Sequence, residues 1–241
     1  MTETLRLTQE EQDRMLLKLA HELGLDKKYV IMTNKELRRS LEEYDKSIRD
    51  VLYSLKVNIR GKHRLANMVQ MEDRIFFIKN GLRDSSAVYD YEDDKIYGCN
   101  HDPYIKLSLL HEDIHYLGTH GKFSGVFNIE TKENEAFNEC MTEYITWLVW
   151  FLMTEEDIGY TSYDAQIEVL EPFFMELGLK KLLDIYFNNK IDYLKRIFER
   201  RTNYSWKEFN EKFDKTLRNP IGIEETIYAE LDELKEVFKN D

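Results

Sequence analysis

The stretch L-L-H-E-D-I-H-Y-L-G, residues 109–118, decides which fold we expect for this chain. Two histidines, His111 and His115, stand four residues apart, and Glu112 directly follows the first. Residues four apart lie on one face of a helix, so both imidazoles can point a ring nitrogen at one place. Imidazole nitrogens at about 2.0–2.1 Å suit zinc, and the glutamate can reach a water on the metal without being a ligand. The stretch therefore predicts a metal site on a rigid, half-buried helix.

The residues around this motif predict a helix that ends at residue 118. Asp102 can accept hydrogen bonds from the first free amides, Pro103 fits the first turn, and Gly118 favours a helix end. An apolar stripe lies beside the histidine face and is formed by Leu107, Leu110, Ile114 and Leu117. This stripe favours an active-site helix over a surface helix with two solvated histidines.

A third ligand is expected on the next helix, which contains K-E-N-E-A-F-N-E-C-M-T-E-Y-I-T, residues 132–146. Glu135, Glu139 and Glu143 are spaced four apart on it. At about 100° per residue, Glu143 lies closest to the centre of the apolar stripe, Glu139 next and Glu135 nearly opposite. A ligand must come from the margin of the buried face, and a carboxylate one turn on can accept the other ring N–H of a ligand histidine. We therefore predict Glu139 as ligand and Glu143 as support, against the alternative of a solvated acidic face.

The two motifs resemble those of the gluzincin metallopeptidases, the thermolysin-like clan with H-E-x-x-H on one helix and N-E-x-x-[S/T]-[D/E] on the next. Here they read H-E-D-I-H and N-E-C-M-T-E. The resemblance implies that His111, His115 and Glu139 bind Zn²⁺, that Glu112 is the general base, and that Glu143 supports a ligand histidine. The wider run F-N-E-C-M-T-E-Y-I-T also looks like this helix in small bacterial gluzincin-like proteins.

A second register of the acidic motif stays open. N-E-A-F-N-E, residues 134–139, also fits it loosely, and would make Glu135 the ligand and Glu139 the supporting carboxylate. The order of helical faces favours Glu139, because Glu135 points almost directly away from the apolar stripe.

The rest of the chain predicts helices, then a small sheet, then helices again. Apolar residues recur at helical spacing over residues 8–22 and 35–56. Between about residues 66 and 99, short runs rich in β-branched and aromatic residues alternate with turn-like segments. From about residue 164 to 239 we expect four or so amphipathic helices, broken at Gly178, Asn188-Asn189, Asn203 and Pro220. This order predicts an α+β, predominantly helical fold.

Together with the resemblance, the order of elements predicts a zincin-like core. It would contain a small antiparallel sheet, the HExxH helix and the glutamate-bearing helix, followed by a C-terminal helical part. We assign residues 1–62 to an N-terminal helical segment, 63–160 to the catalytic core and 161–241 to a C-terminal helical subdomain. In zincins a strand before the active-site helix pairs through its open edge with an extended peptide, and here that strand would be about Lys95 to Cys99.

The composition narrows the expected partners. A formal charge of −12 argues against a general nucleic-acid binder, because such proteins gather lysine and arginine to displace phosphate counterions. The N-terminus lacks the apolar segment of a secretory signal, and no apolar run is long enough to span a bilayer. The two cysteines make no disulfide framework. We therefore expect a cytoplasmic protein that binds neither nucleic acid nor membrane.

The expected function is that of a zinc-dependent metallopeptidase of narrow specificity, in which Glu112 activates a zinc-bound water to attack a peptide or protein substrate. The alternative is a regulatory or binding protein on a gluzincin scaffold, with bound zinc and little turnover. The intact Glu112 favours the enzyme. The sequence leaves the oligomeric state and the oxyanion-stabilising group open, and candidates for that group by residue type are His101, His120, Tyr144, Tyr160 and Tyr163.

Overall fold

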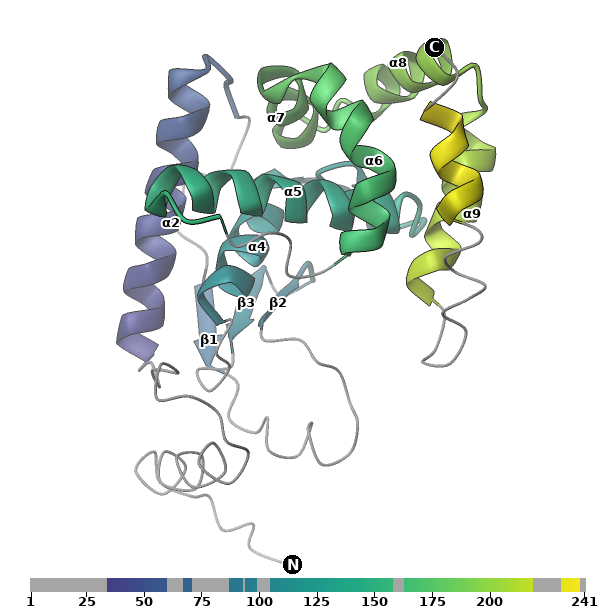
Figure 1. Ribbon diagram of the computed structural model, residues 1–241. Coiled ribbons are helices and arrows are strands. Elements are labelled where there is room, and N and C mark those ends of the chain that lie inside the picture. The colour runs from purple at the N-terminus through teal and green to yellow at the C-terminus, as the bar shows by residue number, and fades with distance from the viewer. Residues whose placement is uncertain are drawn as a thin grey trace, which may run out of the picture.

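The computed structural model describes residues 34–59, 67–70, 87–92, 94–98, 105–157, 163–218 and 231–238 (Figure 1). Over these residues the fold is α+β and mostly helical, as the sequence predicts. Helix α2 (Asn34–Ser54) confirms the amphipathic helix expected over residues 35–56. The helix expected over residues 8–22 and the cap by Asp102 and Pro103 lie outside the described residues.

The first sheet has three strands, β1 (Asn67–Gln70), β2 (Ala87–Asp90) and β3 (Lys95–Gly98), in the order β1-β3-β2. β2 and β3 are antiparallel, as predicted, whereas β1 joins β3 in parallel, so the sheet is mixed. The prediction of an open edge on the strand that begins at Lys95 is wrong, because β3 is the middle strand and β1 and β2 occupy both of its edges. A peptide cannot add to the sheet at β3.

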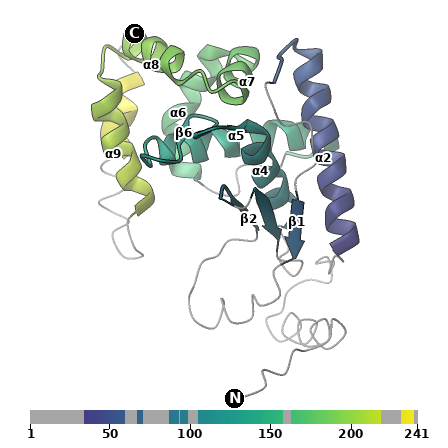
Figure 2. The same cartoon turned by 180° about the vertical axis from the view of Figure 1, so that it is seen from behind.

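Helix α4 (Ile105–Gly118) carries the HExxH motif and ends at Gly118, as predicted. It packs against the first sheet, α2 and α5 (Glu135–Thr154), as both views of the ribbon show (Figures 1 and 2). Ten of its 14 residues are buried, so the helix is enclosed on more sides than its single apolar stripe predicts. His111, Asp113 and His115 are consequently held inside the protein, and Glu112 is half-buried.

A second small sheet, which the sequence does not predict, connects α4 to α5. Its strands β4 (Thr119–His120), β5 (Phe123–Ser124) and β6 (Phe127–Asn128) pair antiparallel. Gly121 and Gly125 make the two turns with φ of 59° and 56°, a backbone conformation that favours glycine. Strands of two residues are too short to show an alternating pattern, which is why the sequence gives no signal for them.

The C-terminal helices are α6 (Asp164–Leu177), α7 (Leu179–Phe187), α8 (Ile191–Thr202) and α9 (Trp206–Arg218), followed by the 3-10 helix η1 (Glu236–Phe238). The predicted breaks at Gly178, Asn188-Asn189 and Asn203 are confirmed. Gly178, Asn189 and Asn203 have positive φ, the conformation in which glycine and asparagine end helices. Pro220 lies outside the described residues. Helix α5 runs from α9 at one end to α2 at the other (Figure 2).

The buried apolar side chains form one cluster that runs from α2 through α4 and α5 to the C-terminal helices. Aromatic rings fill its far end, where Phe198 contacts Phe173, Trp206 and Phe209. The motif helix therefore lies at the centre of the core, between the first sheet and the C-terminal helices.

None of the helices within the described ranges is long and apolar enough to cross a membrane.

Candidate metal centre

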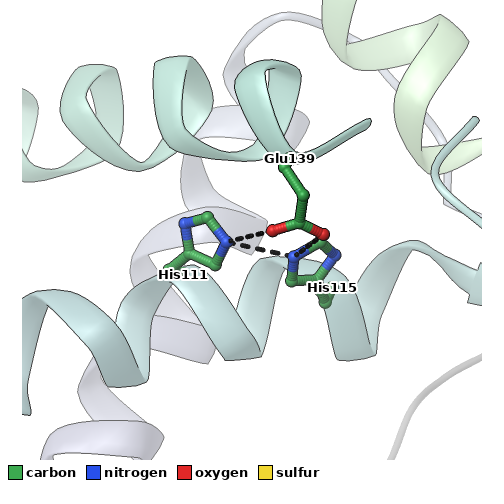
Figure 3. A group of neighbouring side chains, drawn as sticks. All are labelled: His111, His115 and Glu139. Atoms are coloured by element: carbon green, nitrogen blue, oxygen red, sulfur yellow. Dashed lines mark hydrogen bonds and ion pairs between the residues drawn. The ribbon is translucent and has the colours of Figure 1, made fainter. Parts of the chain in front are cut away.

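Two helices bring His111, His115 and Glu139 together (Figure 3). The histidines lie one turn apart on α4, and α5 passes over them and directs Glu139 toward both rings. His111 Nε2 lies 3.0 Å from His115 Nε2 and 3.3 Å from Glu139 Oε2. Glu139 Oε1 lies 3.3 Å from His115 Nε2. One candidate ligand atom from each residue lies within 4.8 Å of the others, so this buried group could hold a metal ion.

The spacing of these atoms fits a zinc-sized cation. Zinc binds imidazole nitrogen at about 2.0–2.1 Å in tetrahedral geometry, which places two ligand atoms about 3.3 Å apart. The separations of 3.0 and 3.3 Å in the group are close to that value. Two imidazoles and one carboxylate also leave a fourth position for another molecule, as catalytic zinc sites do.

The charges around the group stabilise a cation. Burial alone lowers the pKa of His111, but hydrogen bonds to Glu139 and Glu143 outweigh burial and raise it well above its ordinary value. Burial has the opposite effect on a carboxyl group and raises the pKa of Glu139. The nearby His115 and His111 outweigh burial and lower the pKa of Glu139 below its usual range. The group therefore favours a positive charge between its rings, whether a proton or a metal ion carries it.

Glu143 contacts the outer nitrogen of the first histidine. Its Oε2 accepts a hydrogen bond from His111 Nδ1 at 2.9 Å, and its side chain is buried. This contact orients the ring so that Nε2 faces Glu139. Glu135, in contrast, is the first residue of α5 and is not part of the group. Of the two registers of the acidic motif, the structure has the one in which Glu139 faces both histidines and Glu143 lies one turn further on.

Glu112 lies beside the group and is not one of its three members. Its Oε2 accepts a hydrogen bond of 2.8 Å from the backbone N–H of Tyr89 in β2. Burial raises the pKa of Glu112, and the neighbouring His111 and His115 partly lower it again. The first sheet therefore holds a carboxylate of raised basicity next to the candidate metal position.

Four residues of the site were not predicted. Around His115 Nδ1 lie Asn138 Nδ2 at 3.4 Å, Thr142 Oγ1 at 3.5 Å and Tyr186 Oη at 3.3 Å. Tyr91 stands edge-on to the His115 ring, with 6.4 Å between centroids. Asn138 and Thr142 belong to the second motif, so their helical face could have placed them near the histidines. Nothing in the sequence points to Tyr91 or to Tyr186, which follows His115 by 71 residues.

Three of the five candidates for stabilising an oxyanion lie in the described part of the chain. The Tyr163 hydroxyl donates to Glu139 Oε2 at 3.4 Å, at the edge of the group. Tyr144 packs among aromatic side chains, and His120 Nε2 donates to a backbone carbonyl at the end of α7. The other two, His101 and Tyr160, lie outside the described residues.

Comparisons with family models, with curated proteins and with solved structures find no match to this chain. The gluzincin resemblance therefore rests on the two motifs alone.

Proposed function

We propose that this protein is a zinc-dependent peptidase whose metal is held by His111 Nε2, His115 Nε2 and the Glu139 carboxylate. The proposal is carried by the meeting of these ligand atoms within 4.8 Å, with Glu112 held beside them. Structural zinc sites are usually closed by four protein ligands, whereas catalytic sites have three. Within the described residues the group has three members, which favours a catalytic role.

The residues beside the metal position would activate the water and orient the base. When bound, zinc would supply a Lewis acid for a peptide carbonyl and lower the pKa of a water molecule. Glu112 takes a proton from this water as the water oxygen bonds to the carbonyl carbon. The same carboxyl then gives the proton to the amide nitrogen as the C–N bond breaks. Its hydrogen bond from Tyr89 N–H orients the carboxylate, and its raised pKa makes it a stronger base than an exposed glutamate.

We assign Tyr163 to the stabilisation of the oxyanion. Its hydroxyl donates to Glu139 Oε2 at 3.4 Å, so it lies at the edge of the group and carries a proton for a hydrogen bond. An O–H donor beside the metal position can stabilise the negative charge that develops on the carbonyl oxygen. On substrate binding the Tyr163 hydroxyl would exchange Glu139 for the carbonyl oxygen of the peptide.

A binding or regulatory protein with bound zinc and little turnover is the second candidate. The observation in its favour is that both groups assigned to the chemistry are engaged by the protein itself. Glu112 accepts from Tyr89 N–H, and Tyr163 donates to Glu139. Turnover requires that at least the second contact be exchanged for substrate.

Metal analysis tests the site on which both candidates depend. After exposure to excess zinc and desalting, the wild type should hold about one zinc per chain. Glu112→Gln should keep the metal, whereas His115→Ala and Glu139→Gln should lose it. Glu135→Gln is the matched control, because it makes the same change one turn earlier on α5, and it should keep the zinc. Wild type without zinc overturns the proposal, and loss in Glu135→Gln with retention in Glu139→Gln reverses the register.

Digestion of a peptide library then separates the two candidates. We expect the wild type to cleave and Glu112→Gln to cleave at least about 100-fold more slowly, since a positioned general base contributes about 10²–10⁴-fold. Zinc content measured on the same samples shows that the variant differs in its base and not in its metal. Zinc binding without any cleavage by the wild type would instead support the binding protein.

A further inference from the structure

We infer that Tyr186 is a positioning residue of the metal site. Its hydroxyl accepts the Nδ1 proton of His115 and so presents the Nε2 lone pair of that histidine to the metal. The inference rests on the proposed metal site and adds to it a residue of α7 that neither motif contains. It is carried by the hydrogen bonds around His115 and by the close packing of the Tyr186 ring.

Among the described residues, no carboxylate contacts Nδ1 of His115 in the way that Glu143 contacts Nδ1 of His111. Nδ1 of His111 faces a carboxylate, which only accepts, so once a metal takes the place of any proton on Nε2 the remaining proton lies on Nδ1. The groups around Nδ1 of His115 all carry protons: an amide NH₂, a threonine hydroxyl and a tyrosine hydroxyl. A neutral imidazole that binds metal through Nε2 must keep its proton on Nδ1. One of these three groups therefore has to act as the acceptor.

Asn138 cannot be that acceptor, because its oxygen is already used. Asn138 Oδ1 accepts the backbone N–H of Val126 at 2.9 Å, which turns the NH₂ group toward His115. That NH₂ group can only donate. Its contact with His115 Nδ1, at 3.4 Å, suits the opposite tautomer, in which Nε2 carries the proton and donates to Glu139. Metal binding through Nε2 must replace this tautomer by the one protonated on Nδ1.

The two hydroxyls form a directed chain that ends at a carbonyl. Thr142 Oγ1 donates to the backbone oxygen of Asn138 at 2.8 Å, so it is the acceptor in its 2.7 Å contact with Tyr186 Oη. The Tyr186 proton is thereby committed to Thr142, and the lone pairs of Oη are left for His115 Nδ1 at 3.3 Å. In the resulting order, His115 donates to Tyr186, Tyr186 to Thr142, and Thr142 to the Asn138 carbonyl. Every proton in this chain has one acceptor.

Close packing fixes the position of the Tyr186 ring. The side chain is fully buried and packs against two glycines, Gly118 at the end of α4 and Gly125 in the turn before β6. A Cβ on Gly118 would lie 2.6 Å from Tyr186 Cε1, and one on Gly125 would lie 2.4 Å from Cε2. Asn189 Nδ2 donates to the carbonyls of both glycines, at 2.9 and 2.7 Å, and ties the end of α7 to them. The close packing of the ring against the backbone of these two glycines therefore sets the position of the hydroxyl.

The zinc affinity of Tyr186→Phe, measured by competition with a chromophoric chelator, tests the inference. This change keeps the ring packed against the two glycines and removes only the oxygen. We expect the affinity to fall about 10- to 100-fold, the usual effect of losing a group that orients a ligand histidine. Thr142→Val should also weaken zinc binding, because the Tyr186 proton then turns to His115 Nδ1. Thr142→Ser retains the hydroxyl and should bind zinc as the wild type does.

Nitrogen-15 NMR of histidine-labelled, zinc-loaded protein gives a readout that packing alone would not move. In the wild type His115 should show a protonated Nδ1 and a metal-bound Nε2. Wild-type affinity in both Tyr186→Phe and Thr142→Val overturns the inference and leaves the metal site standing. A wild type that binds no zinc overturns the proposed function itself. Should Tyr186→Phe fail to fold, the comparison of Thr142→Val with Thr142→Ser decides.

Discussion

At the scale of the residue, three carboxylates lie around the candidate metal position, and each makes a different contact. Glu139 faces both imidazoles, Glu143 accepts from the outer nitrogen of His111, and Glu112 is held by the backbone of β2. The first two charges balance those of a divalent cation. In the proposed mechanism Glu112 then carries one further negative charge and acts as the base.

Asp113, next to Glu112 in the motif, destabilises the folded protein and is not part of the metal group. It is fully buried, and within the described residues neither of its carboxylate oxygens has a hydrogen-bond partner. Burial raises its pKa well above the ordinary value, Asp45 raises it further, and Arg49 lowers it in part. Folding therefore requires that this carboxyl hold its proton at a pH where the unfolded chain would release it.

We predict that Asp113→Leu raises the free energy of unfolding by about 1–3 kcal/mol at pH 7, because it removes a buried polar group without partners and keeps a branched side chain of similar shape. The gain should be larger at pH 7 than at pH 4. At pH 4 the carboxyl of the unfolded chain is already about half protonated, so folding costs little extra, whereas at pH 7 it is ionised. Urea unfolding at both values measures this. A decrease in stability at pH 7 would show that the carboxyl is needed for packing.

At the scale of the element, the short second sheet sets how α4 and α5 meet. Asn138 Oδ1 accepts the N–H of Val126, and Asn134 Nδ2 donates to its carbonyl at 3.1 Å, so two side chains of the α5 region hold the turn before β6. The same turn forms one wall of the space for the Tyr186 ring. The connection between the two motif helices is thus part of the metal centre.

We predict that Gly125→Ala destabilises the fold far more than Gly121→Ala. Both glycines have positive φ, which costs an alanine about 1–2 kcal/mol. A Cβ at Gly121 meets nothing within 4 Å, whereas one at Gly125 lies 2.4 Å from both Asn138 Oδ1 and Tyr186 Cε2. Overpacking adds about 1–3 kcal/mol at Gly125. Urea unfolding compares the two variants, and equal losses would contradict the packing described here.

At the scale of the whole molecule, α9 holds the beginning of the helix that bears Glu139. Asn134, the residue before α5, has left-handed backbone angles and makes no side-chain capping bond. Asp214 of α9 takes over this role and accepts the backbone N–H of Ala136 at 2.9 Å. Trp206, at the start of α9, donates from Nε1 to Asn134 Oδ1 at 3.1 Å. The C-terminal helices therefore reach the metal centre twice, through α9 at the start of α5 and through α7 at His115.

We predict that Asp214→Ala lowers the free energy of unfolding by about 1 kcal/mol, within the range found for lost helix caps. Glu211→Ala is the control on the same helix, because Glu211 is exposed and pairs with the exposed Lys207 at 3.8 Å. Its effect should stay within about 0.5 kcal/mol. Chemical unfolding of both variants measures the difference. If the two changes cost the same, Asp214 does not cap α5.

The local part of the metal centre could be predicted from the sequence. His111 with His115, and Glu139 with Glu143, are pairs four residues apart, and the helical repeat alone places each pair on one face. The breaks at Gly178 and Asn203 follow equally from local backbone preferences, because both residues have positive φ. Gly118 does not, and a Cβ there would lie 2.6 Å from the Tyr186 ring, so packing requires this glycine.

Only the tertiary structure decided the rest. That β3 is the middle strand, that Tyr89 holds Glu112 and that Tyr186 reaches His115 all depend on contacts between segments far apart in the chain. Such contacts are selected by the packing of the whole core and leave no periodic pattern in the sequence. The sequence by itself determined which side chains can meet a metal on each helix. The tertiary structure decided which helix faces which, and which further side chains hold those ligands in place.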